Sequence, residues 1–295
     1  MNRVDFDKIY RAVPAEQREA LRRFRETHPP KRLTVNDVTW EYLVGGEGDQ
    51  TLLILVGGIR YADAAFRVMM RFESIHRVIA PTYPPLTTIT AIVDGVTAIL
   101  DAEGVAHTHI MSSSFGGAVA QFFVREHPEK VARLILSNTG GGCEPEYVER
   151  IRKAIRLLSL IPMWLLRPRF RRRMKTLADA FPESERAFWQ AFFAELTARE
   201  TKEEAIALYK CILDAAERGA NFRAGDLADW PGDIFIIGSD DDTGIPEPMR
   251  ESLKALYPQA RVHTFHGAGH MPSVTHADEY NALIMDFLKE GWQQG

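Results

Sequence analysis

The chain has 295 residues, of which 45% are hydrophobic, 26% charged and 10% aromatic; this is enough apolar material for a folded core and argues against disorder. Its formal net charge of −4 provides no global basic field, so nucleic-acid binding is not expected. Two cysteines, Cys143 and Cys211, can form neither a disulfide framework nor a thiolate-rich zinc site. With no apolar run as long as a signal peptide or a membrane span, we expect a soluble, cytoplasmic protein.

The amino-terminal part of the chain predicts a helix, a hairpin and a first buried strand. Residues 15–28 have the composition of an exposed leading helix. Residues 32–35 and 38–44 alternate apolar and polar side chains around Asn36-Asp37, which is typical of a β-hairpin. Residues 51–56 are continuously apolar and therefore fit a strand that is covered on both faces, as in a parallel sheet.

Further along, short apolar runs alternate with helical patterns. The predicted strands are at 78–80, 107–112, 131–137, 233–238 and 260–265, and the predicted helices at 88–103, 115–127, 247–257 and 276–290. This alternation predicts an α/β fold, with a mostly parallel sheet and helices on both faces. Between 138 and 231 the chain has helical periodicity and no clear strand. We therefore predict a core formed by 1–139 and 226–295, and an inserted helical subdomain formed by 140–225.

The most informative motif is residues 112–117 (SSSFGG), which directly follow a predicted strand and begin a helix. A nucleophilic serine on such a sharp turn needs small residues two positions before and two positions after it, so that strand and helix can approach. Ser114 meets this requirement, because Ser112 and Gly116 flank it. For either of the other two serines, one of these positions holds a large side chain. Ser114 is thus the predicted nucleophile.

This motif resembles the nucleophile elbow of the α/β-hydrolase family, usually G-x-S-x-G, with Ser112 in place of the first glycine. The resemblance implies the α/β-hydrolase fold with a helical cap. It also implies a serine, an acid and a histidine in that chain order, and chemistry that needs neither a metal nor an organic cofactor.

The acid is expected after the strand at 233–238. In the family this segment reads G-x-x-D, with a proline a few residues later. Asp241 is three residues after Gly238, whereas Asp242 is four before Pro246, so the motif is one residue longer than usual. We predict Asp241 as the acid because it lies closer to the strand end, and we keep Asp242 as the alternative.

The histidine is expected in residues 267–272 (GAGHMP), which resemble the catalytic histidine loop of the family. The small residues before His270 allow its loop to fold over the strand ends, where Ser114 is expected. This pattern predicts His270 as the general base, and His266 is the rival to be tested.

The developing oxyanion needs preorganised hydrogen-bond donors. By resemblance, these are the backbone N–H groups of Ile59 and of Phe115, the residue after the nucleophile. Gly57 stands where the family often has a histidine, so that supporting side chain is absent. The two backbone donors do not depend on it.

Two further segments, 82–85 (TYPP) and 256–260 (LYPQA), are similar to maspardin-like proteins, which are regarded as binding or adaptor proteins. Our first hypothesis is a serine hydrolase that cleaves a carboxylic ester or similar acyl bond; carbon–carbon and lactone hydrolysis stay open, because the same residues serve these reactions. The alternative is a slow or non-catalytic adaptor that binds through its basic cap. The presence of His270, which some maspardin-like proteins lack, favours the hydrolase.

The stretch 150–175 contains ten Lys or Arg residues and no Asp or Glu, so the net charge of the remainder of the chain is about −14. An apolar run, 157–166, lies in its middle. It could be a lid over the serine that accepts an apolar acyl or aryl group, a segment that rests on an anionic membrane surface or partner, or a cap with solvated arginines. A small-molecule substrate and a largely apolar pocket are expected in any case.

Overall fold

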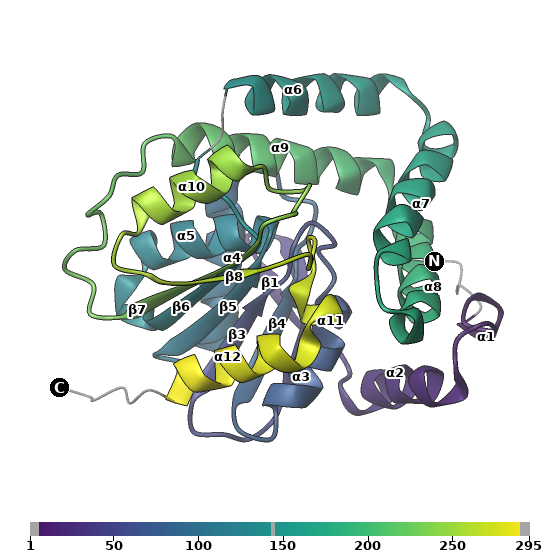
Figure 1. Cartoon of the computed structure of the whole chain (residues 1–295), viewed down its shortest axis with the longest axis horizontal. Coiled ribbons are helices and arrows are strands. Elements are labelled where there is room, and N and C mark those ends of the chain that lie inside the picture. Colours follow the sequence, from purple (N-terminus) through teal and green to yellow (C-terminus); the bar gives the residue numbers. More distant parts are fainter. Residues whose placement is uncertain (1–5, 143–144, 290–295) are drawn as a thin grey trace.

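The computed structural model describes residues 6–142 and 145–289; Cys143 lies outside them. An eight-stranded sheet forms the centre of the molecule, in the order β1-β2-β4-β3-β5-β6-β7-β8 (Figure 1). The strands are β1 (Lys31–Val35), β2 (Val38–Gly45), β3 (Thr51–Leu55), β4 (Arg77–Thr82), β5 (Thr108–Ser113), β6 (Val131–Ser137), β7 (Asp233–Ser239) and β8 (Arg261–Phe265). Strand β2 is antiparallel to β1 and β4, and all other pairs are parallel, which confirms the predicted mostly parallel sheet.

Helices cover both faces of this sheet (Figure 1). One face carries α4 (Ile89–Ala102), α5 (Phe115–Glu126) and α10 (Glu247–Leu256), and the other carries α3 (Phe66–Phe72) and α12 (Ala277–Lys289). Shorter or peripheral elements are α1 (Phe6–Ile9), α2 (Ala15–Thr27), α11 (Pro272–Thr275) and the 3₁₀ turns η1 (Ala62–Ala65) and η2 (Pro128–Lys130). None of the helices within the described residues is long and apolar enough to cross a membrane.

The apolar pattern explains the strands. Every residue of β3 and β6 is buried, as expected for continuously apolar strands inside a two-sided sheet. The hairpin of β1 and β2 turns through Asn36 and Asp37, whose φ angles of 49° and 63° are those of a two-residue turn that matches the strand twist.

Among the residues described between β6 and β7 there are four helices, which we call the inserted helices. They are α6 (Pro145–Leu160), α7 (Met163–Asp179), α8 (Glu183–Arg199) and α9 (Lys202–Gly219). Helix α6 packs on α9 and α7 packs on α8. Together they lie beyond the sheet on the side where the carboxyl ends of the parallel strands open (Figure 1).

The amino-terminal helices attach the inserted helices to the sheet. Helix α2 is not the exposed helix that its composition suggests, because Leu21 and Phe24 are buried. On the same helix, Arg25 donates to Glu195 of α8 at 3.1 Å and to Asp63 of η1 at 2.7 Å. The hydroxyl of the buried Tyr10 also donates to Glu195. Arg25, through Glu195 and Asp63, therefore joins α2 to two segments that are distant in the sequence, α8 and η1.

The ionisation of Glu195 is set by two opposing effects. Burial alone would raise the pKa of its carboxyl, but the charge and hydrogen bonds of Arg25 and the hydrogen bond from Tyr10 outweigh burial and lower it. Because the pKa is lower in the folded than in the unfolded protein, this carboxylate stabilises the fold above its unfolded pKa of about 4.3. The stabilisation is lost as the pH falls through the folded pKa.

We expect the substitution Glu195→Gln to lower the free energy of unfolding at pH 7 by about 2 kcal/mol, since it removes one of the two carboxylates that pair with the partly buried Arg25. The loss should shrink below about pH 4, where the wild-type carboxyl takes up its proton. Urea denaturation at both pH values measures this. Glu19→Gln, which removes an exposed ion pair to Arg22, is the control and should change stability by about 0.5 kcal/mol or less. An equal, pH-independent effect of both substitutions would contradict the role of Glu195.

Candidate active site

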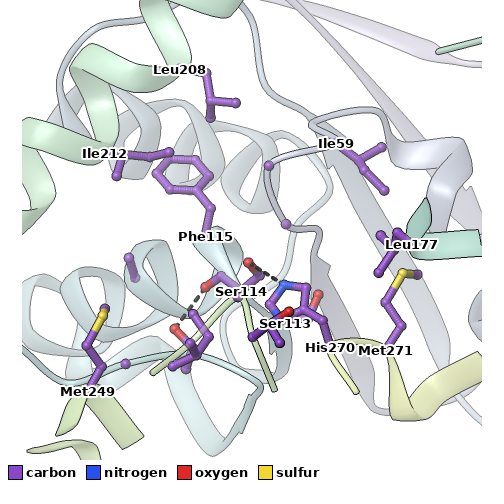
Figure 2. Close-up of a pocket in the computed structure, with 18 of the residues that line it drawn as sticks. Ile59, Ser113, Ser114, Phe115, Leu177, Leu208, Ile212, Met249, His270 and Met271 are labelled. Carbon is purple, nitrogen blue, oxygen red and sulfur yellow. Dashed lines mark hydrogen bonds between the residues drawn. The ribbon is translucent and has the colours of Figure 1, made fainter. Parts of the chain in front are cut away.

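Ser114 lies on a sharp turn between β5 and α5. Its φ of 50° and ψ of −121° are rarely adopted by residues other than glycine, so neighbouring contacts must hold this backbone. Its N–H donates to the carbonyl of Ser137 at 3.0 Å, and Thr139 Oγ1 donates to its carbonyl at 2.8 Å. The turn is thus fixed to the end of β6, and the Ser114 side chain is directed into a cavity (Figure 2).

Close packing between strand and helix accounts for the small residues two positions before and after Ser114, as expected. A Cβ atom on Gly116 would lie 2.1 Å from the carbonyl oxygen of Leu55, so α5 can approach β3 only with glycine there. Ser112, in the other crowded position, is buried and its hydroxyl donates to the carbonyl of Ile135 at 2.6 Å. That hydroxyl is occupied inside the sheet, which explains why a serine is accommodated two residues before Ser114.

Ser114 and His270 are brought together from positions 156 residues apart in the chain. His270 Nε2 lies 3.1 Å from Ser114 Oγ, and His270 Nδ1 lies 2.9 Å from both carboxylate oxygens of Asp242. When Nδ1 carries the imidazole proton, it donates to Asp242 and leaves Nε2 free to accept from the serine hydroxyl. The three side chains therefore form one continuous chain of hydrogen bonds.

Asp242 is buried at the inner end of this chain. Burial alone would raise the pKa of its carboxyl, but hydrogen bonds from His270, Asn138 Nδ2 and the backbone N–H of Gly244 outweigh burial and lower it. The N–H of Ile245 also donates to it at 3.1 Å. These donors keep Asp242 ionised, which favours the Nδ1-protonated form of the imidazole.

The partner of His270 is Asp242, and the prediction of Asp241 is wrong. After β7 the chain turns back, with the N–H of Asp242 approaching the carbonyl of Ser239, and this turn buries Asp242 beneath the imidazole. The exposed Asp241 instead accepts from the N–H of Gly269 at 2.8 Å and so helps to hold the loop that carries His270. The spacing of four residues between Asp242 and Pro246 in the sequence was the better signal for the acid.

His266 is not a rival to His270. Its side chain is 87% exposed and pairs with Asp240 at 2.7 Å, on the outside of the same loop.

Sequence analysis did not identify Asn138. It follows β6 with a left-handed φ of 44°, and its Nδ2 donates to Asp242 at 2.8 Å and to the carbonyl of Gly269 at 3.2 Å. It therefore joins the acid loop to the histidine loop. Its position at the carboxyl end of the strand between β5 and β7 was the available signal, because neighbouring parallel strands end at the same edge of the sheet.

Ile59 and Phe115 line the same cavity as Ser114 (Figure 2). Phe115 is the first residue of α5, so its N–H has no acceptor within the helix. Ile59 lies in a tight turn in which the N–H of Arg60 donates to the carbonyl of Gly57 at 3.0 Å. A Cβ on Gly57 would lie 3.2 Å from Ser114 Cβ, so this turn runs close beside the serine.

The cavity above Ser114 has a volume of about 1020 Å³ and lies between the sheet edge and the inserted helices. Apolar side chains flank Ser114 and His270 on both sides (Figure 2). On one side lie Phe115, Leu208, Ile212 and Met249, and on the other Ile59, Leu177 and Met271. Gln121 also lines it, but its amide already donates to the carbonyls of Gly117 and Gly140. Among the described lining residues, Arg173 is the one Lys or Arg.

Within 6–142 and 145–289, no cluster of three or more His, Cys, Asp or Glu side chains is arranged to hold a metal ion. Cys211 of α9 is buried, and burial raises the pKa of its thiol to about 12.

Comparisons with known proteins show what the chain as a whole is similar to. The sequence pattern of the alpha/beta hydrolase family matches residues 53–283. A 2-hydroxy-6-oxo-6-phenylhexa-2,4-dienoate hydrolase of Comamonas testosteroni is 25% identical over an alignment that covers 87% of this chain and 93% of that protein.

Solved structures share the fold, as the resemblance of the sequence predicted. The enzyme of the same name from Rhodococcus sp. strain RHA1 has a TM-score of 0.71 at 17% identity, over 89% of this chain and 99% of that one. A thermophilic esterase from Thermogutta terrifontis has a TM-score of 0.70 at 17% identity, over 88% of this chain and 98% of that one.

Two substitutions separate the hydrogen bonds of Asn138 from its backbone strain. Asn138→Gly keeps the left-handed backbone and removes the amide, so we expect a loss of about 1–3 kcal/mol in the free energy of unfolding. Asn138→Ala removes the same amide but keeps the Cβ at positive φ, so it should be about 1 kcal/mol less stable than the glycine variant. Urea denaturation of both variants measures the difference. Wild-type stability in the glycine variant would show that the amide does not hold the two loops together.

Proposed function

The chain belongs to the alpha/beta hydrolase family, and from this we propose that it is a serine hydrolase with Ser114 as the nucleophile, His270 as the general base and Asp242 as the acid that orients it. The observation that carries the proposal is the chain of hydrogen bonds, 3.1 Å from Ser114 Oγ to His270 Nε2 and 2.9 Å from His270 Nδ1 to Asp242. A serine hydroxyl is inert near neutral pH unless a base takes its proton, and here the base is already in hydrogen-bond contact.

The reaction proceeds in two steps. Ser114 Oγ attacks the carbonyl carbon while its proton passes to His270 Nε2, and His270 then gives that proton to the leaving group. A water molecule, which His270 deprotonates, then attacks the acyl group on Ser114, and His270 returns this proton to Ser114 Oγ as the acid is released. The ionised Asp242 stabilises the imidazolium that forms in both steps.

The tetrahedral intermediates need donors for their oxyanion. We assign this role to the backbone N–H groups of Phe115 and Ile59. The assignment is supported by the position of Phe115 at the start of α5, where the N–H is free and the helix dipole favours negative charge. It is also supported by the close approach of the turn at Gly57 to Ser114.

We propose a carboxylic ester, or a similar acyl compound with an apolar group, as the substrate. Residues 140–225 then form a cap whose helices complete the cavity wall, and the core consists of 1–139 and 226–295. The mostly apolar side chains on both sides of Ser114 support an uncharged substrate with hydrocarbon on the acyl side, the leaving-group side or both. We place this activity in the cytoplasm, where Cys211 would stay reduced.

Carbon–carbon bond hydrolysis is the second candidate. It is favoured by the relative from Comamonas testosteroni, whose name describes hydrolysis of a phenyl-substituted dienoate. Such a substrate carries a carboxylate, and the described lining residues offer it one cation, the exposed Arg173. This single exposed cation is the reason for placing the ester first.

The assignment of the acid can be tested with a fluorophosphonate probe that captures an activated serine. Ser114→Ala should abolish capture, and Asp242→Asn should slow it by about a thousandfold or more, because the imidazole loses the partner that fixes its tautomer. Asp241→Asn is the matched control: its side-chain oxygen can still accept from Gly269, so the rate should change by less than about tenfold.

Each other outcome contradicts a part of the proposal. Capture that persists in Ser114→Ala would identify a different nucleophile. Equal slowing by both asparagine substitutions would remove Asp242 from its orienting role. A folded wild-type protein that captures no probe would favour the slow or non-catalytic adaptor.

The bond type can be tested with p-nitrophenyl esters from acetate to palmitate and, in parallel, with 2-hydroxy-6-oxo-6-phenylhexa-2,4-dienoate. Each buried methylene contributes about 0.8 kcal/mol, or about fourfold in kcat/KM, so octanoate should exceed acetate by more than about tenfold. Ser114→Ala is the control for both substrates. Turnover of the dienoate with higher kcat/KM than any ester would replace the ester by the carbon–carbon bond.

A further inference from the structure

The corner where α6 meets α7 exposes large apolar side chains. Leu160 is 81% exposed and Trp164 is 72% exposed, and Leu157 and Leu165 are about half exposed. The three other tryptophans among the described residues, Trp40, Trp189 and Trp230, are all buried. Within α6 and α7 the buried side chains are few: Ile151, Leu158, Leu166 and Ala178. The apolar run in the basic stretch is thus only partly used for packing.

Five cations lie on the same two helices. They are Lys153, Arg156, Arg169, Arg171 and Arg172, all exposed. None of the five forms an ion pair with any of the residues that the structure describes, whereas the neighbouring Arg152 pairs with Glu217 at 2.7 Å. We call the four exposed apolar residues and these five cations the α6–α7 corner. At this corner the surface combines apolar side chains with unneutralised positive charge.

We propose that the α6–α7 corner docks onto the surface of an anionic phospholipid bilayer. Leu and Trp side chains enter the headgroup and acyl boundary of a bilayer, where the amphipathic indole ring is favoured, and Lys and Arg beside them attract anionic lipid headgroups. The corner points away from the sheet (Figure 1), so a flat surface can reach it without contact with the core. This inference concerns binding and goes beyond the proposed catalytic function.

A second copy of the chain fits this surface less well. Two corners that met across a two-fold axis would bring two sets of unpaired cations together. Contact between the corner and an acidic region elsewhere on another copy would be head-to-tail and would build open chains rather than a closed dimer. An anionic bilayer meets both the charge and the apolar side chains at once.

The corner and the cavity share a helix. The side of α7 that faces the core carries Phe170, Met174 and Leu177, and these residues line the cavity above Ser114. A bilayer at the corner would therefore lie next to one wall of the cavity. If the proposed function holds, an apolar ester dissolved in the bilayer would have a short path to Ser114.

Vesicle binding tests the docking surface without any turnover. We expect the full chain to cosediment with phosphatidylcholine vesicles that contain phosphatidylglycerol at least about tenfold more strongly than with pure phosphatidylcholine vesicles, and to dissociate at high salt. Trp164 is the exposed tryptophan among the described residues, so its emission should shift to the blue and resist acrylamide quenching on binding.

Two variants of the corner should each weaken binding by about tenfold or more: Leu160→Ser with Trp164→Ser, and Arg169→Gln with Arg171→Gln and Arg172→Gln. Controls make comparable changes outside the corner. They are Ile75→Ser with Val262→Ser, both about half exposed, and Arg23→Gln with Arg71→Gln and Lys289→Gln, all at exposed positions. The controls should bind like the wild type. Thermal unfolding of every variant verifies that it is folded.

Three results would overturn the docking surface: no binding to the anionic vesicles, binding that the two corner variants leave unchanged, or an equal loss in the controls. Light scattering without lipid tests whether a second copy of the chain binds at the corner instead. Self-association that the corner variants abolish would show that the surface is a contact between copies. Fluorophosphonate capture measured on the same samples is independent of all these outcomes. A failure of docking can thus be told apart from a failure of the proposed function.

Discussion

The site depends on one steric constraint, the close approach of α5 to β3 beside Ser114. With 2.1 Å between a Cβ on Gly116 and the Leu55 carbonyl oxygen, only glycine lets the helix start there. This approach leaves the backbone at Ser114 strained by about 1–3 kcal/mol, and the hydrogen bonds to the end of β6 offset that strain. Because the turn is held on both sides, the serine hydroxyl has a fixed position, and a single proton acceptor can be placed against it.

The parallel sheet then brings the remaining groups to the same edge. Strands β3, β5, β6, β7 and β8 run in one direction, so the loops that follow them meet although they are far apart in the sequence. Asn138 is central in this arrangement, since it donates both to Asp242 and to the loop that carries His270. Burial of Asp242 is tolerated for the same reason: several donors compensate the loss of water around its carboxylate.

The sequence predicted the features that arise from local pattern. The hairpin at Asn36-Asp37 follows from alternation and turn residues, the buried strands β3 and β6 from continuous apolar runs, and the place of Ser114 from the size of its neighbours. Features that depend on contacts between distant loops were not predictable in this way. Whether Asp241 or Asp242 meets the histidine is decided by the turn after β7, which the Gly269 N–H and Asn138 help to fix. The attachment of α2 to α8 through Glu195 depends in the same way on a partner 170 residues away.

The inserted helices differ in how many of their apolar side chains they bury. Helix α8 buries its aromatic side chains, among them Phe188, Phe192 and Phe193, and is tied to the amino-terminal helices by Glu195. Helix α7 packs on α8 and α6 packs on α9, but α6 and α7 bury few of their own side chains. Since exposing Leu160 and Trp164 to water is unfavourable, a cap with solvated arginines alone does not account for the α6–α7 corner. A surface that covers the corner gains the apolar contacts that the fold leaves unused, and α7 couples that surface to the cavity through its opposite side.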